Sequence, residues 1–286
     1  MKHEINEKYV QRFFLGVALS AISALLLIAL FIFREGIPFI FHYGLKDFLF
    51  SSDWRPEAGK FGIFPMIAST FWVTAGALMV GAPLGIAGAI FLSEFVPRTI
   101  MQIIKPAIEL LAAIPSVIYG FIGVMVLAPM IREYFGGAGL SVLAASIILG
   151  IMVLPTIISI SIDSILAVPG SYREGAYALG ATVWQTTHMV TLKAARSGII
   201  ASIILGLGRA IGETMAVIMV AGNSVKTPHS PLDSVRTLTA NIALEMSYAT
   251  GLHRESLFAT GVILFIAIVI LNSIAGLAIK RRVGKK

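Results

Sequence analysis

Long apolar blocks alternate with polar segments along the chain. Each block is long enough to cross about 30 Å of hydrocarbon, which requires about 20 helical residues. The apolar–polar alternation typical of membrane β-strands is not seen, so the pattern predicts an all-α integral membrane protein. We predict six transmembrane helices, at residues 13–33, 64–92, 107–131, 140–163, 198–222 and 256–279.

The segment at 164–197, called here the polar loop, is long for a connector between two spans. Ser171-x-x-Glu174 and Thr182-x-x-Gln185 fit capping boxes and lie on either side of Gly180. They predict two short helices joined at that glycine. Four large side chains lie among these signals: Tyr172, Tyr177, Leu179 and Trp184. They suit a partner protein with a groove, although an ordinary solvated connector is the plainer interpretation.

Small residues and prolines recur within the spans. Gly81-x-x-x-Gly85 is a pattern that lets two helices approach closely. Pro83, Pro115 and Pro155 each remove a helix hydrogen bond and favour a kink. Tight helix packing is the favoured interpretation, with a moving gate as the alternative.

Charge predicts the orientation. The net charge is +7, which fits an excess of Lys and Arg on the cytoplasmic side better than nucleic-acid binding. With the N-terminus inside, the inner side holds 13 Lys and Arg and the outer side holds 8. The dense basic tail at 280–286 supports this assignment, so both termini and the polar loop are expected in the cytoplasm. The first apolar run exceeds a signal-peptide core and is kept as a span.

Composition narrows the function classes. The chain is 57% hydrophobic and 13% charged, against about 45–50% and about 25% in soluble domains. It has no cysteine and its five histidines are scattered, so we expect no metal site and no cofactor. The sequence lacks G-x-x-x-x-G-K-[ST], so ATP hydrolysis, if any, belongs to another chain and this one is not expected to be an enzyme.

Two charges lie within the fifth predicted span. Arg209 and Glu213 are four residues apart and would share one face of a continuous helix. A charge at such a depth costs about 2.5–3.5 kcal/mol on insertion scales. A neutralising structural pair is one explanation. The other is that Arg209 contacts a passing anion, because its N–H fork matches phosphate oxygens, with Thr214 adding a hydroxyl.

A motif in the polar loop resembles a known family. The residues Glu174-Gly175-Ala176, Gly180, Val190 and Leu192 match the spacing of the EAA loop of ABC-importer permeases. Glycine replaces the first alanine of that motif, valine its isoleucine and Lys193 its proline. The resemblance implies a type I ABC importer permease fold and a loop that docks onto a cytoplasmic ATP-binding subunit.

Three further segments resemble the phosphate-specific ABC permeases, and more closely their PstC-type subunits: IPSVIYGFIG at 114–123, GLGRAIGETMAVIMVAGN at 206–223 and TLTANIALEM at 237–246. The resemblance implies a subunit of an ATP-driven phosphate importer in a prokaryotic inner membrane. It also implies three partners: a homodimer of ATP-binding subunits, a second, PstA-like permease and an extracytoplasmic phosphate-binding protein.

This interpretation divides the chain into three parts. Residues 1–63 form the first span and an outer loop, 64–279 the permease core of five spans, and 280–286 a basic tail. Two alternatives remain. One is a permease for another oxyanion, such as sulfate, molybdate or phosphonate. The other is a stand-alone secondary transporter, which usually carries an inverted repeat. A membrane-embedded enzyme would need clustered catalytic side chains on facing spans, and the spans lack them.

Overall fold

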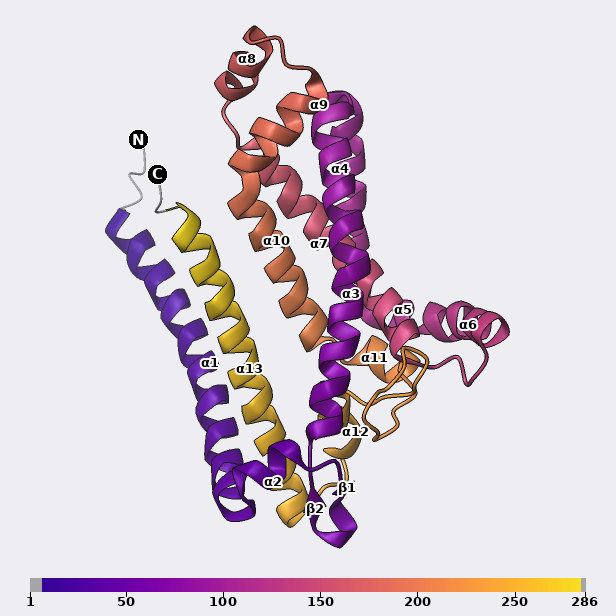
Figure 1. The fold of residues 1–286 in the computed structure, drawn as a ribbon. Coiled ribbons are helices and arrows are strands. Elements are labelled where there is room, and N and C mark those ends of the chain that lie inside the picture. Colours follow the sequence, from indigo (N-terminus) through magenta and orange to yellow (C-terminus); the bar gives the residue numbers. More distant parts are fainter. Residues whose placement is uncertain (1–6, 284–286) are drawn as a thin grey trace.

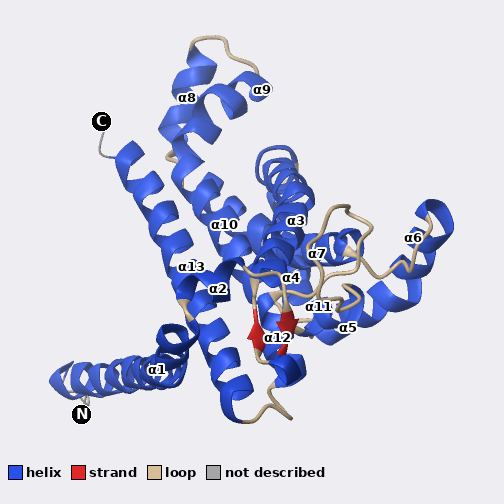
Figure 2. Cartoon of the chain, turned by 60° about the horizontal axis from the view of Figure 1, so that its bottom comes forward, coloured by secondary structure: helices blue, strands red, loops and turns tan. Residues whose placement is uncertain are grey.

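The computed structural model describes residues 7–283 and is built almost entirely of helices (Figures 1 and 2). Two short strands, β1 (Trp54–Arg55) and β2 (Lys60–Phe61), pair antiparallel. The helices are α1 (Glu7–Tyr43), α2 (Leu45–Phe50), α3 (Phe64–Ile90), α4 (Arg98–Ala112), α5 (Ser116–Ile122), α6 (Ala128–Phe135), α7 (Val142–Leu166), α8 (Gly170–Ala178), α9 (Val183–Thr186), α10 (Leu192–Gly212), α11 (Met215–Val220), α12 (Leu238–Glu245) and α13 (Gly251–Val283). Wider π-helical turns occupy Phe91–Phe95, Gly123–Leu127 and Thr187–Thr191.

Six helical segments among these residues are long and apolar enough to cross a membrane, which confirms the predicted number. They are Tyr9–Tyr43, Phe64–Phe95, Ser116–Phe135, Val142–Leu166, Val183–Gly212 and Gly251–Ser273.

The helices form two groups (Figure 1). Helices α1 and α13 run side by side, and α3, α7 and α10 pack together beside them. The polar-loop helices α8 and α9 lie at one end of the molecule, toward which the start of α1 and the end of α13 also point. The opposite end carries α2 and the β1–β2 hairpin. The side of the membrane that each end faces stays a prediction. Of the basic tail, residues 284–286 lie outside the described part, as do the side chains of 280–283.

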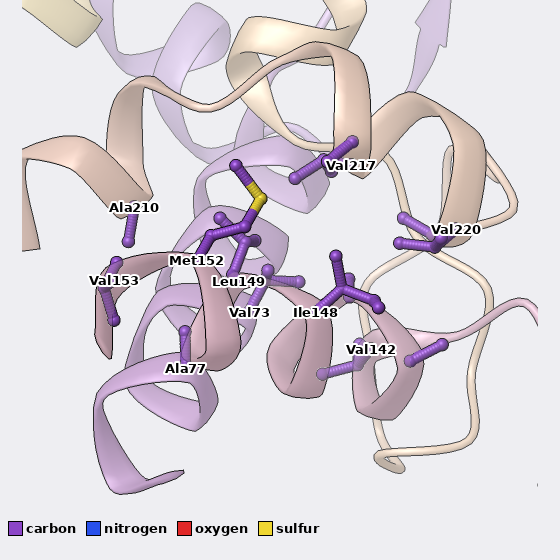
Figure 3. Close-up of a cluster of buried hydrophobic side chains, with 14 of the residues drawn as sticks. Val73, Ala77, Val142, Ile148, Leu149, Met152, Val153, Ala210, Val217 and Val220 are labelled. Atoms are coloured by element: carbon purple, nitrogen blue, oxygen red, sulfur yellow. The ribbon is translucent and has the colours of Figure 1, made fainter. Parts of the chain in front are cut away.

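The main core lies where α3 and α7 meet, with α10 and α11 packed against them (Figure 3). Glycines make the approach close, as predicted. A Cβ at Gly81 would lie 2.6 Å from Cγ2 of Val153, and one at Gly85 would lie 2.8 Å from Cγ2 of Ile157. Both separations are shorter than side-chain carbons normally tolerate, so the α3–α7 contact depends on glycine at these two positions.

The outer loop at 34–63 is structured. Helix α1 continues to Tyr43, and α2 and the hairpin fold back onto α3 and α13. Trp54 and Phe48 are buried in a cluster with Leu257 of α13, whereas Phe50 is exposed. Two of these aromatic side chains therefore belong to the core of this outer end, whereas the third lies at its surface.

The stretch between the second and third predicted spans, at 93–106, is largely helical, so the loop that the span boundaries predict there is wrong. This stretch contains the end of a π-helical turn, Phe91–Phe95, and the first half of α4. Helix α4 is amphipathic: Ile103 and Leu110 are exposed, while Lys105 and Glu109 lie on the side that contacts α7. Because the charged residues on the side facing α7 lower the mean hydropathy of α4, the segment does not stand out as a span from hydropathy alone.

Candidate functional site

The fifth predicted span, at 198–222, is broken after Gly212. Helix α10 ends at Gly212, Glu213 has extended backbone angles (φ −71°, ψ 127°), and α11 begins at Met215. The prediction that Arg209 and Glu213 share a helix face is therefore wrong, because the helix stops between them. Glycine weakens a helix, and the Glu213 carboxylate supports the break by accepting the backbone N–H of Ala216 at 3.2 Å.

Arg209 lies in the last turn of α10 and is half-buried. Its Nη2 donates to the carbonyl oxygen of Ala112 at 3.2 Å, and its Nη1 donates to Oγ1 of Thr156 at 3.4 Å. Ala112 is the last residue of α4, where carbonyl groups lack partners within the helix. Arg209 therefore bridges α10, the end of α4 and the middle of α7. Thr214, also half-buried, donates to the Gly212 carbonyl at 3.3 Å.

A second helix break lies beside the first. Helix α4 ends at Ala112 and α5 begins at Ser116 after Pro115, which cannot donate a backbone hydrogen bond. Because Arg209 reaches the carbonyl of Ala112, the breaks in α4–α5 and α10–α11 meet at one guanidinium group. Non-helical backbone at membrane depth is tolerated where it is buried in protein or lines a water-filled cavity. The pair of breaks therefore places backbone groups that lack helical partners beside one cationic side chain.

A polar seam, formed by side chains of α4 and α7, continues from Arg209 toward the polar loop. Lys105 forms an ion pair with Asp163, and Ser159 donates to Oε1 of Glu109 at 3.1 Å. Sequence reasoning missed these four residues as a group. Their spacing carried a signal, because Lys105 and Glu109 are four apart on α4 and Ser159 and Asp163 are four apart on α7.

The polar loop folds as two short helices, α8 and α9, as predicted. Gly180 lies between them with φ +81°, a backbone conformation that suits glycine. The Thr182 capping box forms in full: Thr182 N–H donates to Gln185 Oε1 at 2.9 Å, and Gln185 N–H donates to Thr182 Oγ1 at 3.3 Å. The capping box predicted at Ser171 is wrong, because α8 begins directly after Pro169 and has no side-chain cap.

The residues of the EAA-like motif are distributed over this loop. Glu174 and Gly175 are exposed on α8, and Ala176 is buried on the same helix. Val190 and Leu192 are half-buried where the loop enters α10. Large apolar and aromatic side chains around the motif face outward, with Leu179 at 90% exposure; the others are Tyr172, Tyr177, Val183 and Trp184. Such a patch on short helices suits a protein partner.

The outer end holds a buried polar cluster that the sequence did not reveal. Glu245, at the end of α12, forms an ion pair with Arg236 and accepts from Trp54 Nε1 at 3.0 Å. His253 Nε2 lies 2.8 Å from the same carboxylate. The cluster borders a cavity of about 790 Å³. Burial raises the pKa of Tyr248 at this cavity, and the neighbouring Glu245 carboxylate adds to the shift.

The family model described as "Binding-protein-dependent transport system inner membrane component" matches residues 81–285, which is well over half of the chain. The chain belongs to this family. It is therefore a multi-pass, non-catalytic component of an inner membrane, and family membership implies a binding protein and an ATPase as partners.

The chain resembles other permeases both in sequence and in fold. It is 43% identical over 87% of its length to a probable ABC transporter permease, YqgH, of Bacillus subtilis, covering 83% of that protein. It is 40% identical over 80% of its length to the phosphate transport system permease protein PstC of Mesorhizobium japonicum, covering 76% of it. Its fold matches a chain of a bacterial alginate ABC importer with a TM-score of 0.62 at 16% identity, over 96% of this chain and 98% of the other. The predicted ABC importer permease fold is confirmed.

Proposed function

We propose that this chain is the membrane-spanning permease subunit of an ATP-driven phosphate importer, and that Arg209 is the cationic contact for the anion on its way through the membrane. The observation that carries the proposal is the position of Arg209 where two broken spans meet. Relatives named as phosphate transport permeases, at 35–40% identity over about four fifths of the chain, support phosphate as the substrate.

The chemistry of the site suits a tetrahedral oxyanion. A guanidinium is charged at every physiological pH and presents five N–H donors, of which two are engaged by Ala112 and Thr156. The others leave room for a fork-like contact with phosphate oxygens. Glu213 and Thr214 lie at the same break, and we propose that they border the pathway rather than pair with Arg209.

The remaining partners follow from the same proposal. A second permease subunit, PstA-like, completes the pathway, and two ATP-binding subunits dock on the polar loops of the two permeases. An extracytoplasmic binding protein delivers phosphate at the end that carries the β1–β2 hairpin. Both termini lie in the cytoplasm in this arrangement, together with α8 and α9. The polar-loop surface around Glu174 supports the docking step, because it joins an exposed carboxylate to exposed aromatic side chains.

The test is phosphate uptake by cells or vesicles that contain Arg209→Gln, with Thr156→Val as the matched control. Truncating one partner of a desolvated charge contact costs about 2–5 kcal/mol, so uptake by Arg209→Gln should fall about 30-fold or more. Thr156→Val removes one hydrogen-bond partner of the guanidinium and leaves its charge, so most uptake should remain. Near-normal uptake by Arg209→Gln at wild-type protein level would reject Arg209 as the anion contact.

Competition separates phosphate from other oxyanions. Excess unlabelled sulfate, molybdate or phosphonate should leave uptake of labelled phosphate unchanged in the wild-type complex, while unlabelled phosphate suppresses it. Stronger suppression by one of the other oxyanions would assign the permease to that substrate instead.

A further inference from the structure

A buried ion pair joins the polar loop to the transmembrane helices. Glu94 lies in the π-helical turn Phe91–Phe95 that follows α3, and its side chain is only 5% exposed. Arg173 of α8 donates to Oε1 of Glu94 at 2.7 Å through Nη2. The same guanidinium donates to the backbone carbonyl oxygens of Ile165 and Val168 at 3.0 Å each. Arg173 thus holds three segments together: α8, the end of α7 and the turn after α3.

The contact is unusual for this loop, because most of α8 is exposed. Ionised carboxylates are rarely buried without a partner, and removing the partner of such a group is strongly destabilising. Ile165 is in the last turn of α7 and Val168 lies just beyond its end, where carbonyl groups need donors from outside the helix. Arg173 satisfies both requirements at once, which fixes the position of α8 relative to α3 and α7.

A second contact reaches the same π-helical turn from the other half of the loop. The ring of Trp184, on α9, lies 6.4 Å from the ring of Phe95, and it stacks on His188 at 6.2 Å. Both short helices of the polar loop therefore contact the residues that follow α3. Single π-helical turns within helices are frequent at functional sites.

We propose that Arg173 is a positioning residue that, through Glu94, couples displacement of the polar loop to movement of α3 and α7. The proposal rests on the proposed function, in which the polar loop is the docking surface of the ATPase. Helices α3 and α7 are suited to move as one body, because they are in close contact at Gly81 and Gly85. Helix α7 also carries Thr156, a hydrogen-bond partner of Arg209, so the body reaches from the loop to the anion contact.

The experiment uses the complete transporter, reconstituted with its ATPase, second permease and binding protein. The variants are Arg173→Gln and Glu94→Gln, with Arg196→Gln as the matched control, because Arg196 is an exposed arginine at the end of the same loop, where it has already entered α10. Three quantities are measured: ATPase co-purification, ATP hydrolysis and phosphate uptake. Arg173→Gln should keep the ATPase bound and ATP hydrolysis active while uptake falls about tenfold or more, so that more ATP is used per phosphate.

Further variants keep the proposal falsifiable. Glu94→Gln keeps the shape of the side chain and an acceptor oxygen, so it should fold even if Arg173→Gln does not, and should also raise the ATP used per phosphate. The double variant should be no worse than Arg173→Gln, because both changes break one contact. Arg173→Lys should restore part of the coupling, and Arg196→Gln should behave as wild type.

Two results would overturn the proposal. One is a normal ratio of ATP to phosphate in both Arg173→Gln and Glu94→Gln at wild-type protein level. The other is loss of the ATPase from Arg173→Gln, which would assign the arginine to docking instead of coupling. Neither result would affect the proposed function, whose failure has a different signature: a wild-type complex that hydrolyses ATP but imports no phosphate.

Discussion

The close contact between α3 and α7 predicts that one methyl group at Gly81 destabilises the protein. In Gly81→Ala the new Cβ would lie 2.6 Å from Cγ2 of Val153 and 2.9 Å from the carbonyl oxygen of Gly150. Non-bonded carbon atoms prefer separations of about 3.5–4.0 Å, so the helices would have to move apart by roughly 1 Å. Part of the obstacle is backbone, which a change of side-chain rotamer cannot relieve.

The magnitude follows from two opposing effects. Overpacking a well-packed core costs about 1–3 kcal/mol. Alanine is favoured over glycine within a helix by about 1 kcal/mol, which offsets part of this cost. Because part of the obstacle is the Gly150 backbone, the overpacking cost should lie in the upper part of its range, at about 2–3 kcal/mol. We therefore expect a net loss of about 1–2 kcal/mol in the free energy of unfolding, or roughly 5- to 30-fold in the unfolding equilibrium. Adding Val153→Ala to Gly81→Ala should recover only part of the lost stability, because the Gly150 carbonyl remains in place.

Gly88→Ala is the matched control on the same helix. There the nearest atom to a new Cβ is Cδ1 of Ile158 at 3.5 Å, an ordinary contact. The helix preference for alanine should then dominate, leaving this variant as stable as wild type or up to about 1 kcal/mol more stable. The assay is unfolding of the purified chain by SDS in mixed micelles, followed by circular dichroism. Equal stability of the two variants would refute the argument that α3 and α7 are in steric contact at Gly81.

Two further predictions concern topology and pH. A reporter fused after Lys286 should be cytoplasmic and a tag at Ala58 should be outside; if both report the same side, the number of spans is wrong. The backbone N–H groups of His229 and Ser230 donate to the Asp233 carboxylate at 2.8 Å and lower the pKa of Asp233. The stability that these hydrogen bonds contribute is complete above the ordinary Asp pKa of about 3.9, and it is lost as pH falls through the lower pKa of the folded state. In the wild type, the backbone amides of residues 229–235 should therefore show constant protection from hydrogen exchange between pH 7 and pH 5, after correction for intrinsic rates. In Asp233→Asn the same amides should exchange faster at pH 7. A loss of protection in the wild type between pH 7 and pH 5 would contradict the lowered pKa of Asp233.

Features set by nearby residues were predictable from the sequence. The six spans follow from apolar runs, because a helix in lipid satisfies its own backbone hydrogen bonds. The Thr182 capping box needs only Thr182 and Gln185, three residues apart. Ser171 has the same spacing to Glu174, but Pro169 starts the helix early and places Ser171 inside its first turn. The residue types and spacing of the Ser171 motif therefore fit a capping box, but the helix starts before Ser171 and the box cannot form there.

Features that depend on distant residues were not predictable. The break at Gly212 lies inside an apolar run, so hydropathy and the spacing of Arg209 and Glu213 both favoured a continuous helix. What stabilises the break comes from elsewhere: Thr239 donates to the Glu213 carbonyl at 3.2 Å. The hydrogen bond between Trp54 and Glu245 likewise joins residues 191 positions apart. A single sequence gives no indication of such pairs.

The arrangement around Arg209 provides a physical reason for anion binding and helix movement to be linked. Nη2 of Arg209 supplies a donor to the Ala112 carbonyl, at the end of α4. A phosphate that took over this N–H would leave that carbonyl without its side-chain donor, which is costly unless α4 shifts to another donor. On the proposed function, an anion that displaces this hydrogen bond would therefore bind more strongly to a state in which the Ala112 carbonyl has found another donor. A ligand shifts a conformational equilibrium only by its difference in affinity for the two states, and in this site a single hydrogen bond supplies such a difference.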